Sequence, residues 1–409
     1  MKKRHVIIAG GGASGLIAAI SAAREGADVT IVEQKERLGK KILSTGNGRC
    51  NLTNEYMDVS CFHGDDTTIV SEILEEFGYQ ETISFFEELG VILKDRQGYV
   101  YPVSDQAGTI VDVLRMEIEH LKIKVILEES VKNISKEHRG FIVFTKNNKL
   151  HGDAVILATG GKAAPVLGSD GSGYTLAKSF GHKLSPVVPA LVQLRGKGNF
   201  FKQISGVRTQ AKVSLYVNNE YICEDTGELQ LTNYGISGIP VFQISRYAAK
   251  ALYEKKSVMV EVDFLPNMSD DTFEGLLQKR LELHGYRTAE DFLIGIFHKK
   301  LIGLLLTASR INSKQVMNAV TKEQINKLVS ISKHFRVEID GTNDFEQAQV
   351  CAGGVRTSEV NPESLESVYV DGLYLTGELL DIDGICGGYN LQWAWSSGYV
   401  AGKHAAKGQ

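Results

Sequence analysis

The sequence predicts an α/β protein whose main domain is built from both ends of the chain, with a small β domain and a helical domain inserted between them. Three observations predict this fold. A strand, a glycine-rich turn, a helix and a second strand follow one another at the N-terminal end. Short alternating strands and then amphipathic helices occupy the middle, and a buried strand with a Gly-Gly turn returns near the C-terminal end. Strands and helices that alternate in this way are typical of an α/β fold with a parallel sheet.

The first stretch carries the most informative motif. The apolar run His5–Ala9 suits a strand buried on both faces, and Gly10, Gly12 and Gly15 follow it as G-x-G-x-x-G. Gly10 allows a tight turn, Gly12 lets the backbone approach a pyrophosphate, and Gly15 lets the helix touch the strand. The second strand ends on Glu33, which we expect to accept hydrogen bonds from ribose hydroxyls. This order of elements predicts a dinucleotide site at the N-terminus of the first helix.

Composition narrows the function classes. The chain of 409 residues carries 45 Lys and Arg against 49 Asp and Glu, with no dense basic stretch, so we do not expect a nucleic-acid partner. No apolar run approaches about 18 residues, so we expect no membrane span, and the start of the chain predicts no signal peptide. Five scattered cysteines without a C-x-x-C pair indicate a reduced, cytoplasmic protein. The histidines show no metal-ligand spacing, so we predict no metal.

The segment 37–54 reads RLGKKILSTGNGRCNLTN. It is too rich in Gly, Asn, Ser and Thr for regular structure, and its cations and glycines suit close contact with a polyanionic ligand. A solvated surface loop is the alternative. We favour the ligand-binding interpretation because the segment directly follows the predicted ribose-binding acid.

Periodicity predicts the elements up to residue 191. They are a helix over 66–90, a hairpin over 91–101, a helix over 109–121, strands at 124–127, 131–134 and 141–145, a buried strand at 154–157 and a short helix ended by Gly181. From about Leu191 the pattern changes to short strands and then helices. These are strands at 206–217, 220–223, 227–231, 258–264 and 335–339, and helices at 240–252, 271–283, 288–306 and 322–334.

These elements predict the division of the chain. The first part of the nucleotide-binding domain covers 1–191 and its second part 346–409, with an inserted β domain at 192–267 and 335–345 and an inserted helical domain at 268–334. In the second part, a buried strand at 373–376 leads into Gly377 and Glu378. A Gly-Gly turn at 387–388 then opens a helix, whose N-terminus is a second electropositive end that can stabilise negative charge.

Four segments together resemble one family: GGGASGLIAA, RLGKKILSTGNGRCNLTN, ATGG and TGELLDIDGICGGYNLQWAWSSGYVAG. They are similar to bacterial flavoproteins described as NAD(P)/FAD-dependent oxidoreductases of the BaiN/HI0933 type. More distantly, the chain resembles the flavoprotein subunits of succinate dehydrogenase and fumarate reductase. The resemblance implies a glutathione-reductase-type FAD-binding Rossmann domain that transfers a hydride between FAD and a small organic substrate. Some family members are named as reductases of a conjugated double bond in a 3-dehydro bile acid.

The resemblance also implies roles for residues of this chain. The glycine turn would hold the pyrophosphate, Glu33 the adenosine ribose, Val131 the adenine through its backbone, and Glu378 the ribityl chain. Asn51, Asn390 and Leu391 would lie near the isoalloxazine. The expected cofactor-binding residues are Gly10, Gly12, Ala13, Ser14, Gly15, Glu33, Gln34, Lys41, Thr45, Gly46, Arg49, Cys50, Asn51, Val131, Ala158, Thr159, Gly160, Gly377, Glu378, Gly388, Asn390 and Leu391.

Alkene reduction needs a proton at one carbon beside the hydride at the other, so an acid is required near the flavin. The candidates for polarising or protonating a substrate are Arg49, Tyr101, His182 and Arg356, each of which also has a structural interpretation. Cys50 and Cys386 lie in the two loops expected to flank the flavin. A redox-active dithiol is one interpretation of this pair, and two small buried residues are the favoured one.

Only one G-x-G-x-x-G with its strand context is present, so NAD(P)H would be a transient co-substrate without a Rossmann unit of its own. The alternative function is a flavin-dependent RNA-associated or tRNA-modifying protein. A net charge of −4 favours the small-molecule oxidoreductase. Nothing in the sequence predicts the oligomeric state.

Overall fold

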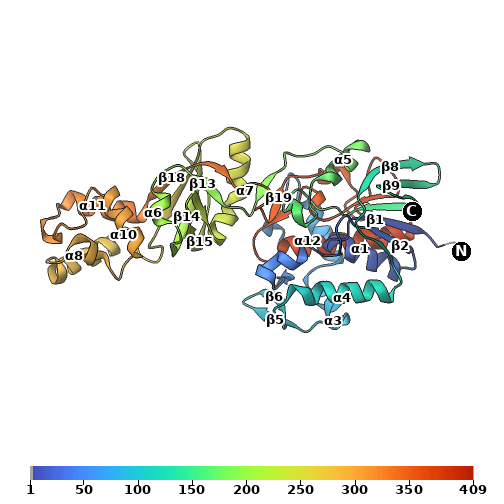
Figure 1. The fold of residues 1–409 in the computed structure, drawn as a ribbon, viewed down its shortest axis with the longest axis horizontal. Coiled ribbons are helices and arrows are strands. Elements are labelled where there is room, and N and C mark those ends of the chain that lie inside the picture. Colours follow the sequence, from blue (N-terminus) through green and yellow to red (C-terminus); the bar gives the residue numbers. More distant parts are fainter. Residues whose placement is uncertain (1–2, 409) are drawn as a thin grey trace. The chain divides into compact units, whose positions relative to one another are not determined.

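A parallel sheet forms the centre of the first of two units in the computed structural model, which describes residues 3–408. Its strand order is β20-β11-β1-β2-β7 (Figure 1). The strands are β1 (His5–Ala9), β2 (Asp28–Val32), β7 (Lys124–Ile126), β11 (Ala154–Leu157) and β20 (Leu373–Leu375). Ala9 pairs in register with Val32 on one side and with Leu157 on the other. The carboxyl ends of the three central strands therefore lie together at one edge, where ligands bind in open α/β sheets.

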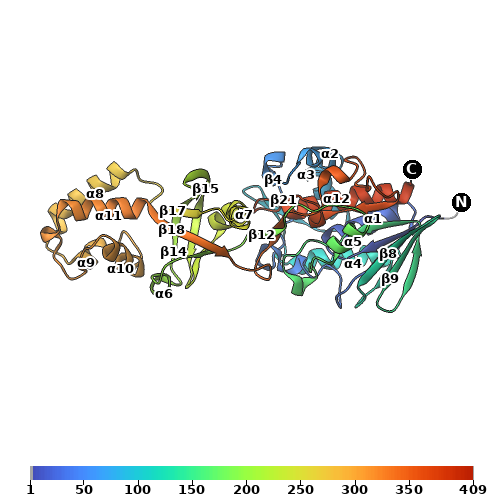
Figure 2. The ribbon, with the colours of Figure 1, turned by 90° about the horizontal axis from the view of Figure 1, so that it is seen from above.

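Two helices from opposite ends of the chain, α1 (Ala13–Arg24) and α12 (Tyr389–Lys407), lie side by side in this unit (Figures 1 and 2). Gly398 and Gly402 allow this close approach, because a Cβ at either position would lie 2.3 Å from a backbone oxygen of α1. The other helices of the unit are α2 (Thr68–Glu76), α3 (Tyr79–Glu88), α4 (Ala107–His120) and α5 (Ser172–Ser179).

The remaining strands of this unit form small antiparallel sheets. β8 (Val131–Glu137), β9 (Gly140–Thr145) and β10 (Lys149–Gly152) make a meander, and β3 (Thr53–Asn54), β6 (Tyr99–Pro102) and β5 (Leu93–Arg96) make a second sheet. β4 (Phe62–His63) pairs with β21 (Asp383–Gly384) in the same manner. β12 (Val188–Ala190) and β19 (Val350–Ala352) form a further two-stranded sheet. The first unit comprises the described residues up to Val188 and from Ala348 onward, and the second is Pro189–Gln347.

The second unit contains a closed barrel with the strand order β13-β16-β15-β14-β17-β18. Its strands are β13 (Leu194–Gly196), β14 (Arg208–Val217), β15 (Glu220–Leu231), β16 (Gly235–Ser237), β17 (Val258–Asp263) and β18 (Phe335–Thr342). The helices are α6 (Phe201–Ile204), α7 (Ile239–Tyr253), α8 (Asp270–His284), α9 (Ala289–Leu293), α10 (Lys299–Ala308) and α11 (Lys322–Lys333). Figure 2 shows α8 to α11 gathered as a helical part between β17 and β18 in the chain. The predicted fold class, with a Rossmann-like sheet, a small β part and helical segments, is confirmed.

Three predicted elements are wrong in detail. The helix predicted over 66–90 is broken at Gly78, the extended N-cap residue of α3, and the Phe77 carbonyl accepts hydrogen bonds from Gln392 and Ser396 of α12 instead of continuing a helical ladder. The strands predicted at 220–223 and 227–231 are one strand, because Gly227 stays extended beneath Pro240 of α7. The helix predicted over 288–306 is two helices, separated by a turn at Gly295 with a φ of 88°.

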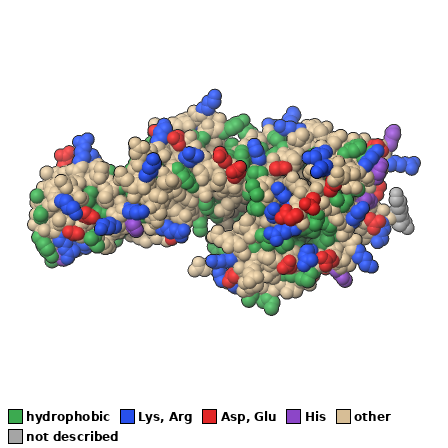
Figure 3. Space-filling view, viewed as in Figure 1, with side chains coloured by type: hydrophobic (Ala, Val, Ile, Leu, Met, Phe, Trp, Pro, Cys, Tyr) green, Lys and Arg blue, Asp and Glu red, His purple; other side chains and the backbone are tan. Residues whose placement is uncertain are grey.

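No helix within residues 3–408 combines the length and the apolar character that crossing a bilayer requires. In Figure 3 the basic and acidic side chains are interspersed over the visible face rather than gathered by sign.

Candidate functional site

The glycine turn joins the end of β1 to the start of α1. Gly10 has a φ of 107°, and a Cβ there would lie 2.4 Å from the Ala158 carbonyl oxygen. A Cβ at Gly15 would lie 2.0 Å from the Gly10 carbonyl oxygen, so only glycine lets this helix touch its strand. Gly12 differs from both, because a Cβ there would meet no atom of the described residues within 4 Å. The turn is therefore closed towards the sheet and open on the side of Gly12.

The N-terminus of α1 is available to an anion. Gly12 is its N-cap residue, so no side chain caps the helix, and its first turn, which includes Ala13 and Ser14, holds no acidic residue. The first N–H groups of a helix have no partner within the helix and carry a partial positive charge. Such an uncapped N-terminus at the carboxyl edge of a parallel sheet suits a phosphate.

Glu33 follows β2 and is 8% exposed. Its Oε2 accepts a hydrogen bond from the Gly11 N–H at 2.7 Å, and its Oε1 accepts one from the Lys35 N–H at 2.8 Å. Each carboxylate oxygen has two lone pairs, so both can accept one further donor. Burial raises the pKa of Glu33 above its ordinary value, and the N–H groups of Gly11 and Lys35 oppose that rise. The carboxylate is thus fixed beside the glycine turn, and each of its oxygens can accept a further hydrogen bond.

The third strand end contributes Ala158, Thr159 and Gly160. Ala158 is buried and its N–H donates to the Ala9 carbonyl oxygen at 2.9 Å, while Gly160 has a φ of 69°. Next to them, Gln34 donates its Nε2 to the Gly168 carbonyl oxygen at 2.5 Å, which ties the end of β2 to the loop after β11. Of these residues, Ala158 and Thr159 lie against Gly10 of the turn.

A second group of predicted residues lies in the loop after Lys41. Thr45, Gly46 and Asn47 interrupt a short 3₁₀ segment, and the Cys50 N–H donates back to the Thr45 carbonyl oxygen at 3.1 Å. Asn47 and Cys50 both have positive φ angles, of 55° and 59°. Backbone strain of this kind in side-chain-bearing residues clusters at ligand sites. The backbone of this loop is thus held in a conformation of raised free energy.

Asn51, at the end of this loop, is 9% exposed. Its Oδ1 atom is buried and has no hydrogen-bond partner among residues 3–408. An unpaired buried carbonyl oxygen costs about 1–3 kcal/mol. A bound molecule with an N–H or O–H donor would satisfy it.

The β5–β6 hairpin presents two tyrosines to the loops that carry predicted residues. Tyr101 lies beside Gly46, with its Cε1 3.6 Å from where a Cβ of Gly46 would be, and Tyr99 lies 3.0 Å from the same point of Gly387. Residues two apart on a strand share a face, so one face of β6 reaches both loops. Sequence reasoning missed Tyr99, although the alternation Tyr-Val-Tyr was its signal. Burial raises the pKa of Tyr101, and the neighbouring Arg49 charge opposes the rise.

Lys41 and Glu378 form an ion pair at 2.8 Å between Nζ and Oε2. The other oxygen of Glu378 accepts the Cys351 N–H at 2.7 Å, so the acid expected at the ribityl chain is held from both sides. Gly377 has a φ of 64° and donates its N–H to Ser397 Oγ at 2.9 Å; a Cβ there would lie 2.8 Å from Ser14 Oγ. These contacts bring the C-terminal residues against the glycine turn.

The start of α12 holds Gly388, Asn390 and Leu391. A Cβ at Gly388 would lie 2.8 Å from the Thr53 backbone, so glycine is required where α12 meets the end of the 37–54 segment. Asn390 uses both ends of its amide on Gly384, accepting its N–H at 2.8 Å and donating to its carbonyl oxygen at 2.7 Å. Asn390 therefore shapes the loop, while Leu391 is half-buried against the core. Trp393 and Trp395 are buried, as expected for core residues.

Two of the four catalytic candidates have partners outside this region. His182 is buried, with Nε2 2.8 Å from Ser367 Oγ and Nδ1 3.3 Å from Glu359, and burial lowers its pKa. Arg356 is exposed, and its backbone N–H donates to the Lys183 carbonyl oxygen. Arg49 and Tyr101 alone among the four adjoin the loop of Gly46.

The remaining predicted positions are less informative. Val131 opens β8 and pairs with Thr145 across a bulge. Cys50 is fully buried, burial raises its pKa to about 12, and none of the five cysteines, all within residues 3–408, is in a disulfide. Within residues 3–408, no group of three or more His, Cys, Asp or Glu side chains is placed to hold a metal ion.

The model of the HI0933-like protein Rossmann domain matches residues 4–404. The chain belongs to the HI0933-like family. This HI0933-like chain is 54% identical over 402 residues to the 3-dehydro-bile acid delta(4,6)-reductase of Clostridium scindens, covering 98% of each chain. It is 29% identical over 400 residues to the ribosomal RNA dihydrouridine synthase of Haemophilus influenzae, covering 96% of each.

Among solved structures, the open conformation of a flavocytochrome c3 fumarate reductase is similar, with a TM-score of 0.52 and 17% identity over 99% of this chain and 78% of that one. This likeness shows the fold. The family and the 54% identical reductase make this chain an oxidoreductase, as the resemblance implied. Three features of the site fit the chemistry of FAD. The open side of Gly12 suits its pyrophosphate, and the Glu33 carboxylate suits its ribose hydroxyls. The unpaired Asn51 oxygen suits a further hydrogen-bond donor of the cofactor.

Proposed function

We propose that this oxidoreductase reduces a conjugated C=C bond of a small organic molecule, with NAD(P)H as the electron donor. The observation that carries the proposal is the 54% identity to the bile acid reductase over 98% of both chains. A 3-dehydro-bile acid with unsaturation at positions 4 and 6 is therefore the first substrate to test. When bound, FAD would supply the hydride for such a reduction.

The chain's own residues would hold the cofactor at two places. The N-terminus of α1, opened by Gly12, would bind the pyrophosphate, and Glu33 would accept the ribose hydroxyls. The strained loop from Thr45 to Asn51 would take the other half of FAD, with Asn51 Oδ1 accepting a hydrogen bond. Lys41 and Cys351 would keep Glu378 in place near the glycine turn.

Arg49 and Tyr101 are the groups we propose on the substrate side. The Arg49 guanidinium is permanently charged, so it would polarise a carbonyl conjugated to the double bond. Tyr101 carries its hydroxyl proton at neutral pH, as a tyrosine ordinarily does, so it would donate that proton to the carbon that does not receive the hydride. Tyr99, on the same face of β6, would offer an apolar wall.

The electron donor would bind weakly. The structure describes one parallel sheet with one glycine turn in residues 3–408, and the proposed site at that turn belongs to FAD. NAD(P)H would then use the same open face of the flavin as the substrate, so the donor must leave before the acceptor enters. We expect ping-pong kinetics and competition between NAD(P)⁺ and the oxidised substrate.

The test begins with chromatography of the flavin released by heat, which should be FAD rather than FMN. Stopped-flow mixing with NADH and NADPH should then bleach the flavin, and the unsaturated 3-dehydro-bile acid should restore its absorbance. Tyr101→Phe should slow reoxidation by the steroid about 10²-fold, without changing bleaching by the nicotinamide. Tyr56→Phe, at a 64% exposed tyrosine of the same unit, is the matched control. Equal reoxidation rates in Tyr101→Phe and the parent would remove Tyr101 from the mechanism.

A second candidate function is the reduction of uridine in RNA. The observation that favours it is the 29% identity to a ribosomal RNA dihydrouridine synthase over 96% of both chains. Dihydrouridine is uridine with its ring C=C bond reduced, so the same groups would serve. A salt-dependent RNA shift assay distinguishes the two functions, because phosphate contacts weaken steeply with salt. Tight RNA binding together with no reoxidation by the steroid would favour the second function.

A further inference from the structure

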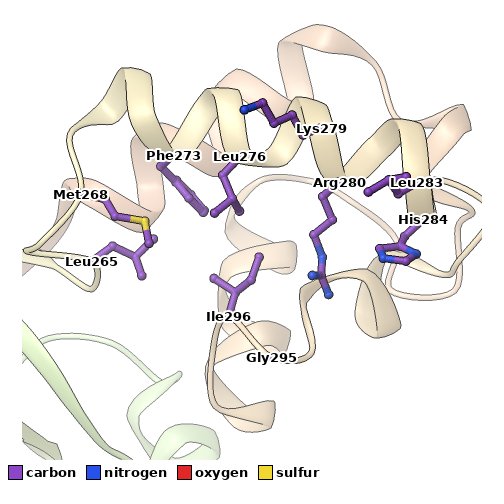
Figure 4. Close-up of a pocket in the computed structure, with 10 residues that line it drawn as sticks. All are labelled: Leu265, Met268, Phe273, Leu276, Lys279, Arg280, Leu283, His284, Gly295 and Ile296. Carbon is purple, nitrogen blue, oxygen red and sulfur yellow. The ribbon is translucent and has the colours of Figure 1, made fainter.

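The helical part of the second unit contains a cavity of about 400 Å³. It lies between α8 and the turn after α9, and ten residues line it (Figure 4). They are Leu265, Met268, Phe273, Leu276, Lys279, Arg280, Leu283, His284, Gly295 and Ile296. A volume of roughly 300–1,000 Å³ is usual for pockets that hold small organic ligands.

The two ends of this cavity differ in chemistry. Figure 4 shows Leu265, Met268 and Phe273 at one end, and Arg280 and His284 at the other. None of the ten lining residues is acidic. One end of the cavity is therefore apolar and the other basic, with Lys279 of α8 between them in Figure 4.

The side chains at the basic end have hydrogen-bonding groups without a partner. Arg280 donates its Nε to the Phe292 carbonyl oxygen at 2.7 Å and one N–H of its Nη2 to Ile294 at 2.8 Å, which fixes the guanidinium and leaves three of its five N–H donors. Nδ1 of His284 is buried without a hydrogen-bond partner in residues 3–408. Over the same residues, neither side chain pairs with a carboxylate. The buried Lys333, by contrast, pairs with Asp263 at 2.7 Å between Nζ and Oδ2.

The rim of the cavity is unusually apolar for a surface. Leu283, which lines it, is 70% exposed, and the adjacent Tyr286 and Ile294 are 67% and 52% exposed. Exposed apolar groups that adjoin a pocket mark binding sites. The ligand would therefore enter over an apolar rim.

We propose that this cavity binds an amphipathic carboxylate, with its apolar body between Phe273, Leu276 and Ile296 and its carboxylate at Arg280 and His284. The fixed guanidinium and the unpaired imidazole nitrogen would both donate to the carboxylate oxygens. Charge-assisted bonds of this kind are roughly twice as strong as neutral ones. This site is separate from the residues proposed for FAD and does not depend on the proposed reaction.

The test is a calorimetric titration of the intact protein with decanoate and with decylammonium, which share a chain and differ in the sign of the head group. Decanoate should bind at least ten times more tightly. Leu276→Trp should abolish decanoate binding by filling the cavity, and His284→Leu should weaken it about tenfold. Gln278→Leu, on the exposed side of α8 and outside the cavity, is the matched control and should bind like the parent.

Circular dichroism and the melting temperature establish that each variant is folded, so the comparison rests on folded protein. Equal binding of decanoate and decylammonium, unchanged binding in Leu276→Trp, or no binding of decanoate would overturn the proposal. Cholate titrated after saturation with decanoate identifies the source of the ligand. Loss of one cholate site points to a steroid carboxylate, and unchanged cholate binding points to a chain-shaped one. Turnover is not measured, so failure of the proposed reaction leaves this result unaffected.

Discussion

The glycine turn and the loop that ends at Asn51 are built in opposite ways. At the turn, Gly11 is held by a neighbour close in the chain, because its N–H donates to Glu33 Oε2 at 2.7 Å. At the loop, a contact comes from farther along the chain, as Tyr101 of β6 adjoins Gly46. The turn leaves the first backbone N–H groups of α1 without a cap, whereas the loop leaves the side-chain oxygen Asn51 Oδ1 unpaired. The two regions thus offer a ligand opposite groups, because the turn offers hydrogen-bond donors and the loop offers an acceptor.

The largest expected effect separates two glycines of the turn. Gly15→Ala should destabilise the fold by about 4 kcal/mol or more, because its Cβ would lie 2.0 Å from a backbone oxygen. Gly12→Ala places its Cβ in open space with an ordinary φ of −80°, so stability should stay equal or rise by about 0.4–1 kcal/mol. FAD retention of Gly12→Ala should nevertheless fall at least tenfold, since the methyl group stands where the pyrophosphate would approach. Denaturant unfolding and flavin content measure the two effects.

The next effect concerns the contacts that attach the loop side to α12. The buried Gln392 donates to the carbonyls of Phe77 and Gly78 and to Thr82, and accepts from Thr53. Gln392→Leu removes the partner of the buried Thr53 and Thr82 hydroxyls and one of the donors to each carbonyl, and should cost about 3 kcal/mol in the free energy of unfolding. Gln80→Leu, at an exposed position on α3, is the control and should cost little. A Gln392→Leu protein as stable as its parent would mean that the broken helix does not depend on α12.

Glu33 gives a smaller effect that depends on pH. Its pKa is raised by burial, and ribose hydroxyls that donate to its carboxylate would lower that pKa again. FAD binding therefore releases protons, so FAD affinity should rise as pH rises through the raised pKa and fall as Glu33 protonates. Glu33→Gln should weaken FAD by about 1.5–3 kcal/mol and flatten the pH dependence. Fluorescence titration of the apoprotein with FAD across pH measures both, and an unchanged slope in Glu33→Gln would exclude Glu33 as the source.

The smallest effect is expected at Cys50. Its pKa of about 12 means that only about one thiol in ten thousand is ionised at pH 8. Cys50→Ala should leave flavin reoxidation within about twofold of the parent, and iodoacetamide should not modify the native thiol. Collapse of activity in Cys50→Ala and in Cys386→Ala alike would instead support a dithiol.

The difference between local and distant contacts also explains which elements and site contacts could be predicted from the sequence. The bounds of β1 and β11 and the start of α11 were predictable because apolar runs, glycine stops and a Thr cap are local signals. The break at Gly78 was not, because the carbonyl of the preceding Phe77 is satisfied by Gln392 and Ser396, over 300 positions away. In the site, the Glu33 contact follows from the motif, whereas the partners of His182 and the proximity of Tyr99 to Gly387 depend on tertiary packing.

The central sheet has a consequence for how the chain is made. Its edge strand β20 and the helix α12 that packs on α1 come from the last 40 residues, while β1 and α1 come from the first 25. During synthesis the first unit stays incomplete until α12 has been made, whereas Pro189–Gln347 is one uninterrupted stretch. We expect the inserted unit to fold first on the ribosome, with the apolar face of α1 exposed to chaperones until the final helix emerges.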